Sequence, residues 1–151
     1  MDVEPALCRR ETKKIDSMID RKIRDGLAAW VEEKGYREGG LLPSDLARRL
    51  DVEPEQLSAF FSLYMGCSFK EWRKRLRIKD AQKMLLEKPS LPVSRVGYTV
   101  GISDHSDFRR QFTDVTGCTP SEWRSINRGV LGWLRLLFGK IKVAVGNRIR
   151  L

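Results

Sequence analysis

Apolar residues recur with a helical period along most of the chain, most clearly over residues 68–88. One side of this stretch carries an apolar stripe, made of Phe69, Trp72, Leu76, Ala81 and Leu85. Ser68 and Glu71 have the spacing of a capping box, and Pro89 is a helix breaker. The pattern therefore predicts one helix, which at about 1.5 Å per residue is roughly 28 Å long.

The same period predicts six further helices, and no stretch alternates as a strand would. We therefore expect an all-α fold, with the other helices at 17–33, 44–50, 54–65, 92–100, 104–116 and 119–127. Their inner faces are expected to hold Met18, Ile19, Ile23, Leu27, Trp30, Val31, Leu46, Ala47, Leu50, Leu57, Phe60, Phe61, Phe108 and Phe112. Residues 1–16 alternate in charge and are predicted to form a flexible lead-in without a signal peptide.

One motif occurs twice, near the start of the predicted 68–88 helix and again after it. Residues 61–73 and 112–124 both follow F-x4-G-C-S/T-x2-E-W-R, and the copies lie 51 residues apart. Each copy begins in the second of two short helices joined by a three-residue turn, the length of a helix-turn-helix turn. We therefore predict two similar units, 42–66 and 91–124, joined by a rigid helix. For the first unit alone, an ordinary helical hairpin is the alternative.

Positive charge is concentrated near the end of the chain. The 151 residues carry a net charge of +9, which favours a polyanionic partner. Residues 128–151 hold six basic and no acidic residues, whereas residues 17–127 have a net charge of only +3. The length suits one domain, or two small units that share an element.

The residues that enzymes and metal sites need are scarce. The chain has one histidine, no P-loop and no G-x-G-x-x-G motif, so we expect neither an enzyme nor a cofactor or metal site. Its three cysteines, Cys8, Cys67 and Cys118, form no CxxC, which argues against a disulfide framework and favours a reducing cytoplasm. No run of 18 apolar residues is present, so we expect no membrane-spanning segment.

These residues resemble the DNA-binding domain of the AraC/XylS family of bacterial transcription regulators. The resemblance covers about residues 42–124, and the preceding helix from Ser17 also fits. Its most specific parts are Arg77-Ile78-x-x-Ala81-x3-Leu85-Leu86, Gly101-Ile102-Ser103-Asp104 and Phe108-x3-Phe112-x4-Gly117-x-Thr119-Pro120-x2-Trp123-Arg124. The resemblance implies two helix-turn-helix units bridged by a long helix, with double-stranded DNA and RNA polymerase as partners. Adjacent major grooves lie about 34 Å apart, comparable to what a helix of roughly 28 Å can separate.

The family pattern places candidate DNA contacts on the second helix of each unit. In the second unit they are His105, Ser106, Arg109 and Arg110. Arg110 is the first choice for a base contact, because a guanidinium can bind guanine O6 and N7 together. In the first unit the outward polar residues are Glu55, Gln56, Ser58 and Ser62. For all of these positions the alternative is an ordinary solvated surface.

Two departures from the family pattern affect these predictions. Ala59 stands where the family often has arginine, and residues 42–66 carry four acidic against two basic residues, which disfavours phosphate contact. Gly97 stands where the family often has alanine, which keeps a close helix crossing but lowers helix propensity by about 1 kcal/mol.

Two basic regions remain open in function. The 68–88 helix carries Lys70, Arg73, Lys74, Arg75, Arg77, Lys79 and Lys83, which either contact phosphate or form a solvated face. The 128–151 segment is a basic amphipathic sequence with Trp133, which suits docking on protein, self-association, a membrane surface or a basic arm on DNA.

Two functional hypotheses follow from the sequence. The first is a sequence-specific transcription regulator that reads adjacent major grooves, mainly with its second unit. The second is an interaction protein that has kept this fold, binds DNA weakly, and uses its 128–151 segment to bind protein or membrane.

Overall fold

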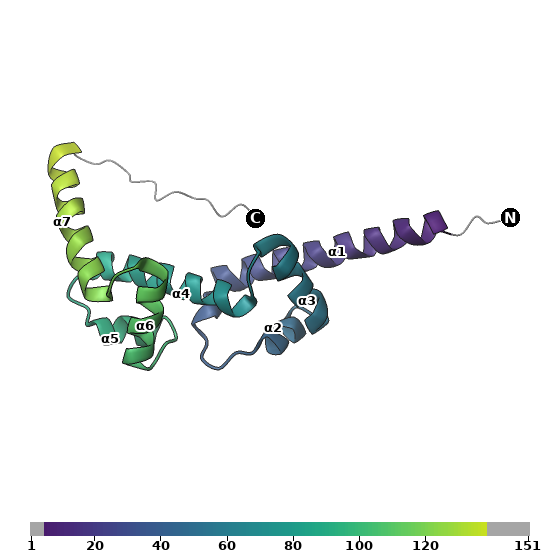
Figure 1. Ribbon diagram of the computed structural model, residues 1–151, viewed down its shortest axis with the longest axis horizontal. Helices are drawn as coiled ribbons and strands as arrows, with labels where there is room; N and C mark the ends of the chain where they lie inside the picture. Colours follow the sequence, from purple (N-terminus) through teal and green to yellow (C-terminus); the bar gives the residue numbers. More distant parts are fainter. Residues whose placement is uncertain (1–4, 139–151) are drawn as a thin grey trace. The chain divides into compact units, whose positions relative to one another are not determined.

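The computed structural model describes residues 5–138, with side chains between residues 17 and 129. Within that range it is helical and contains no strand, so the predicted all-α fold is confirmed. Figure 1 shows the elements, which in order are α1 (Pro5–Glu32), η1 (Gly35–Arg37), α2 (Pro43–Arg49), α3 (Pro54–Phe60), η2 (Phe61–Met65), α4 (Phe69–Glu87), α5 (Val93–Thr99), α6 (His105–Thr116) and α7 (Pro120–Phe138). The chain divides into unit 1, Met1–Arg73, and unit 2, Lys74–Leu151. Among the described residues, no helix has the length and apolar character needed to span a bilayer.

Helices α1 and α7 extend further than the sequence pattern predicts. Helix α1 begins at Pro5, so residues 5–16 are helical rather than a frayed lead-in. Proline is favoured at the first helical position, and the residues that follow contain no helix breaker. Helix α7 continues past Asn127 to Phe138. The Asn127 side chain donates to the Trp123 carbonyl at 2.8 Å, one turn earlier, and so supports the helix instead of ending it.

The core of unit 1 forms where α1, α2, α3, η2 and the start of α4 pack together. Its buried residues include Ile23, Leu27, Trp30, Leu46, Ala47, Leu57, Phe60, Phe61 and Phe69. Trp30 of α1 stacks on Trp72 of α4 with ring centroids 5.9 Å apart. Met18 was expected on this face but is 65% exposed. It precedes Ile23 by five positions, which turns its side chain about 140° around the helix.

Arg73 fastens the segment between α1 and α2 onto α4. Its guanidinium donates to the carbonyls of Tyr36 (Nε, 3.2 Å), Leu41 (Nη1, 2.9 Å) and Glu38 (Nη2). The expectation that Arg73 belongs to a charged face of the long helix is wrong, because the residue is 8% exposed. Carbonyls of irregular buried backbone need donors, and arginine supplies several from one side chain.

The core of unit 2 lies between the rest of α4 and helices α5, α6 and α7. It comprises Ile78, Ala81, Met84, Leu85, Val96, Val100, Ile102, Phe108 and Phe112, with Trp123 packed against it. Arg124 occupies the same motif position as Arg73, and its Nη2 donates to the Leu91 carbonyl at 2.6 Å. The arginine of the repeated motif therefore secures a connecting segment in both units.

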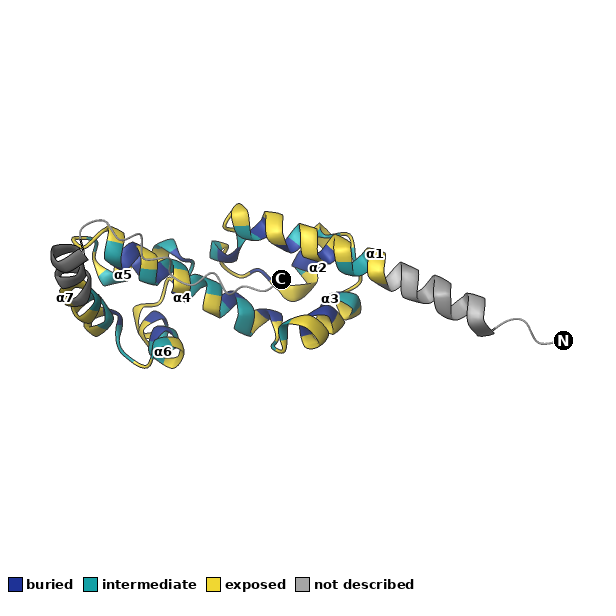
Figure 2. Ribbon diagram, turned by 90° about the horizontal axis from the view of Figure 1, so that it is seen from above, coloured by how far each residue is buried: buried dark blue, intermediate teal, exposed yellow. Residues whose placement is uncertain are grey.

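The two helix-turn-helix turns are built alike. After α2 the Val52 N–H donates to the Ala47 carbonyl at 3.0 Å, and after α5 the Ile102 N–H donates to the Gly97 carbonyl at 2.9 Å. Each turn has one residue with positive φ, Asp51 at 52° and Gly101 at 87°. In both units the second helix presents an exposed outer side, seen for α3 and α6 in Figure 2.

Candidate nucleic-acid interface

Helix α6 is held firmly at both ends and along its inner face. The Asp104 carboxylate caps its start by accepting from the Asp107 N–H at 2.6 Å, and Gly117 ends it in the left-handed region with φ of 80°. Phe108 and Phe112 are fully buried and anchor the inner face. The outer face is therefore presented on a rigid element, which suits precise recognition.

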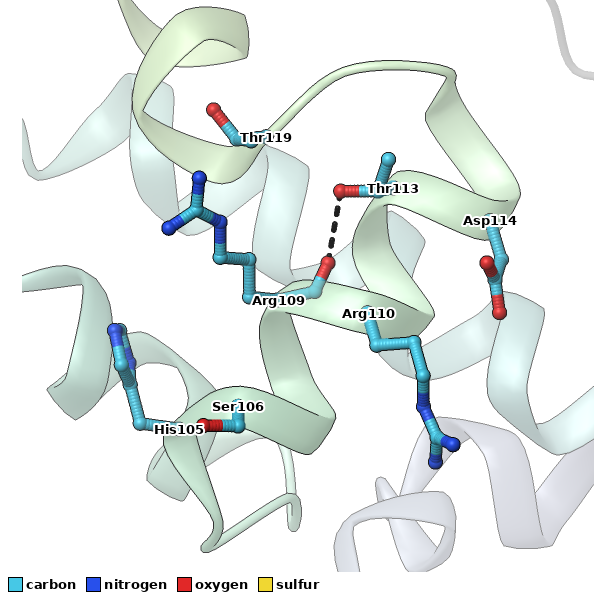
Figure 3. A pocket seen from close by; sticks show the side chains of 7 residues that line it. All are labelled: His105, Ser106, Arg109, Arg110, Thr113, Asp114 and Thr119. Atoms are coloured by element: carbon cyan, nitrogen blue, oxygen red, sulfur yellow. Dashed lines mark hydrogen bonds between the residues drawn. The ribbon is translucent and has the colours of Figure 1, made fainter.

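The four residues predicted from the second unit share the exposed outer face of α6. His105, Ser106, Arg109 and Arg110 are all exposed. They line one open hollow together with Thr113, Asp114 and Thr119 (Figure 3). The first four are the predicted contacts, and the structure places Thr113, Thr119 and the acidic Asp114 on the same surface.

Arg109 and Arg110 point to opposite sides of this surface. Figure 3 shows the Arg109 guanidinium directed toward Thr119, while that of Arg110 turns away from it. Arg110 Nη2 forms an ion pair with Asp107 Oδ1, one helical turn earlier. Arg109 makes no salt bridge to a side chain between residues 17 and 129, although its charge acts on the nearby Glu122 carboxylate, so its N–H donors stay available to an external anion.

The start of α7 forms the border of the surface on the Arg109 side. A capping box holds this helix start: the Thr119 N–H and hydroxyl donate to Glu122 Oε2 at 2.8 and 2.7 Å, and the Glu122 N–H donates back to the hydroxyl at 3.3 Å. These hydrogen bonds, with a smaller contribution from the Arg109 charge, lower the pKa of Glu122. Glu122 therefore stays ionised and fixed beside the exposed arginine.

Helix α3 of unit 1 presents a different chemistry on the equivalent face. The motif offset of 51 residues places Ser58 and Ala59 where unit 2 has Arg109 and Arg110. Ser58 and Ser62 are exposed as predicted. Gln56 is half-buried, and its Oε1 accepts from the Glu53 N–H at 2.9 Å, so it caps α3 instead of standing free.

The basic residues around α2 and α3 are already paired with carboxylates. Arg49 makes two hydrogen bonds of 2.7 Å to Glu38, and Arg48 lies 3.5 Å from Asp45. Lys22 of α1 lies 2.6 Å from the Asp51 carboxylate. The hydrogen bond from Arg49 lowers the pKa of Glu38, and that from Lys22 lowers the pKa of Asp51.

Comparison with known sequences identifies the fold group. A family described as "Helix-turn-helix domain" matches residues 46–126. The arabinose operon regulatory protein of Escherichia coli is 37% identical over 82 residues, which cover 54% of this chain and 28% of that protein. The probable transcription factor PqrA of Proteus vulgaris is 24% identical over 107 residues, which cover 71% of this chain and 86% of that protein. The chain thus spans less than a third of the length of the arabinose regulator.

Solved structures give the same result. The C-terminal domain of AraT, a response regulator from Geobacillus stearothermophilus, aligns with a TM-score of 0.62 and 25% identity, covering 72% of this chain and 84% of that one. A transcriptional regulator with an AraC-type DNA-binding domain from Chromobacterium violaceum aligns with a TM-score of 0.61 and 23% identity, covering 70% of this chain and 90% of that one. The second likeness shows the shared fold.

Proposed function

The chain belongs to the AraC/XylS family of helix-turn-helix DNA-binding transcription regulators, a family of regulators and not of enzymes, and from this premise we propose that α6 is its main reading helix. In this proposal α6 lies in the major groove of double-stranded DNA with His105, Ser106, Arg109 and Arg110 toward the bases and backbone. The observation that supports it most is that these four residues share one exposed face on a well-anchored helix. A helix of this kind fits the major groove, where each base pair shows its own pattern of donors and acceptors.

The two arginines are assigned different tasks. Arg109 makes no salt bridge to a described carboxylate and interacts with Glu122 only through its charge, so its N–H donors are suited to bind a phosphate. Arg110 has a fixed direction through its pair with Asp107, so it is suited to bind a guanine edge. An exposed ion pair of this type is worth about 0.2–1 kcal/mol, so it does not prevent the guanidinium from engaging a base.

We assign α3 a weaker part in the same activity. Gln56, Ser58 and Ser62 are its candidate contacts, and none of them brings a positive charge. With the nearby cations already paired to carboxylates, α3 would enter a second major groove with little help from phosphate attraction. The footprint of the bound DNA, one groove or two, tests this assignment.

The central experiment is an anisotropy titration of the full chain against a selected duplex and a scrambled one at two salt concentrations. The wild-type protein should prefer the selected duplex, and the double variant Arg109→Ala, Arg110→Ala should bind both equally. Arg21→Ala is the control for the loss of a positive charge, since it removes an exposed cation of α1 to which no DNA contact is assigned. Equal binding of both duplexes by the wild-type protein would refute the proposal.

A second candidate function is an interaction protein that keeps the fold and binds DNA weakly. It is favoured by the outer side of η2, where Leu63 is 76% and Tyr64 is 52% exposed, next to a helix without cations. In this reading residues 128–151, of which 139–151 lie outside the described residues, bind protein, self-associate or touch a membrane. Sedimentation with anionic liposomes, with and without residues 128–151, tests the membrane form, and equal sedimentation would exclude it.

RNA polymerase belongs to the first proposal as a protein partner. Supporting this, the similar proteins include the arabinose operon regulatory protein and the probable transcription factor PqrA. Pull-down of purified polymerase on a promoter fragment, with and without the chain, is the direct measurement.

A further inference from the structure

Asp107 is the centre of a small side-chain network on the first turn of α6. One carboxylate oxygen, Oδ1, pairs with Arg110 Nη2, and the other, Oδ2, accepts from Gln111 Nε2 at 2.8 Å. The backbone N–H of the same residue donates to the Asp104 cap at 2.6 Å. Both oxygens and the backbone are therefore held, so the carboxylate has little freedom to rotate.

The network fixes Arg110 without using up its hydrogen-bonding capacity. A guanidinium has five N–H donors. In the described residues Arg110 makes one side-chain pair, through Nη2 alone, and the arginine side chain is 73% exposed. Enough donors remain to bind O6 and N7 of a guanine, while the pair reduces the rotamer freedom that binding would otherwise have to remove.

Arg49 shows the contrasting arrangement in the same protein. Its Nη1 and Nη2 both bind the Glu38 carboxylate, each at 2.7 Å. That two-pronged pair engages both terminal nitrogens of the guanidinium. A carboxylate can thus either use the donors of an arginine or fix the direction of its side chain. The single contact between Asp107 and Arg110 fixes the direction and leaves other donors open.

We propose that Asp107 is a positioning residue that aims Arg110 at a guanine in the major groove, and that Gln111 holds the carboxylate in place for this purpose. The inference rests on the proposed function of α6. Asp107 itself contacts no base in this account, and it acts through Arg110. Its own charge repels phosphate, so its value lies in selectivity and not in affinity.

The test compares two isosteric variants that each remove one negative charge from an exposed ion pair. Asp107→Asn breaks the pair with Arg110, whereas Glu87→Gln breaks the pair that Glu87 of α4 makes with Lys83 at 3.8 Å, outside the α6 surface. Each change makes the net charge more positive by one, so neither should weaken binding to a scrambled duplex. Circular dichroism melting of each variant checks that α6 stays folded.

Selectivity is measured on the duplex that wild-type protein selects from a randomised library. Each guanine is replaced in turn by 7-deazaguanine, which lacks the N7 acceptor. The wild-type protein should lose about tenfold in affinity at one guanine, as expected for one hydrogen bond to a charged donor. Arg110→Ala should lose this discrimination, Asp107→Asn should reduce it about two- to fivefold, and Glu87→Gln should leave it unchanged.

A double-variant cycle separates positioning from a general structural effect. In the Arg110→Ala background, Asp107→Asn should change discrimination no further, because the residue through which it acts is gone. The inference is overturned if Asp107→Asn and Glu87→Gln behave alike, or if Asp107→Asn lowers discrimination equally in both backgrounds. Failure of the wild-type protein to select any sequence would instead refute the proposed function, and the inference with it.

Discussion

Replacing Gly97 by alanine should have two opposite effects on the stability of unit 2. Alanine is favoured over glycine inside a helix by about 1 kcal/mol, so helix propensity alone predicts a more stable protein. A Cβ added at Gly97 would lie 2.8 Å from Cγ and 2.9 Å from Cδ1 of Phe108. These ring atoms belong to a fully buried side chain, which cannot move aside as a surface chain would.

Overpacking of a filled core costs about 1–3 kcal/mol, which exceeds the propensity gain over most of that range. We therefore expect Gly97→Ala to lower the free energy of unfolding by about 1 kcal/mol on balance. In a chain of this size that corresponds to a fall in melting temperature of about 2–4 °C. Because Phe108 anchors α6, the variant should also bind its selected duplex more weakly.

Gly129→Ala is the matched control for this change. Gly129 is an exposed residue of α7, and a Cβ there meets nothing within 4 Å. The Gly129→Ala variant gains helix propensity without a steric clash, so it should stabilise the protein by up to about 1 kcal/mol. Urea unfolding followed by circular dichroism measures both variants. If Gly97→Ala stabilises the protein as much as Gly129→Ala does, the close contact between α5 and Phe108 is not a constraint and the reasoning fails.

Three further predictions follow from individual contacts. Arg109→Ala should reduce the magnitude of the slope of log binding constant against log salt concentration by about 0.9, the value for one phosphate contact. An unchanged slope in anisotropy titrations would show that Arg109 does not contact the DNA phosphates. Arg73→Lys should lower the free energy of unfolding by about 2–3 kcal/mol, since lysine cannot reach all three carbonyls that Arg73 binds. Urea unfolding followed by the fluorescence of the aromatic residues of unit 1 measures this loss. Glu122 has a folded-state pKa below 4.5, so the stability it contributes is present above that pH and is lost as the pH falls below it. Glu122→Gln should therefore flatten the fall in urea midpoint between about pH 5 and 3, and a profile identical to wild type would contradict this.

Local pattern was enough to predict the helices and most of the core. The apolar period identified Ile23, Leu27, Phe108 and Phe112 as inner residues, and all four are buried. The Thr119 capping box was also readable, because its partners lie three residues apart. Such features depend on neighbours along the chain, and a single sequence contains them.

Contacts between distant residues could not be read in this way. The pair between Lys22 and Asp51 joins residues 29 positions apart, and that between Glu38 and Arg49 joins residues 11 apart. Charged residues are seldom buried, so the sequence pattern predicts that Arg73 either contacts phosphate or lies on a solvated face. Only the structure shows that the Tyr36 carbonyl lies where the Arg73 side chain can donate a hydrogen bond to it.

The network at Asp107 lies between these two cases. Its members are three and four residues apart, spacings that bring side chains together on a helix. The spacing makes a pair between Asp107 and Arg110 possible from the sequence, but the sequence leaves open whether the carboxylate is paired or stays free to repel phosphate.

The repeated motif implies a shared framework, whereas the exposed faces of the two units have diverged. Both units keep the buried phenylalanines and the motif arginine, yet unit 2 presents Arg109 and Arg110 where unit 1 presents Ser58 and Ala59. If both units contact DNA, their contributions should therefore differ in salt dependence. Changes at Arg109 or Arg110 should reduce the salt slope, whereas changes at Ser58 should alter affinity equally at low and high salt. A salt slope that fell when Ser58 was replaced would show that unit 1 also displaces counterions, and the proposed division of work between the units would be wrong.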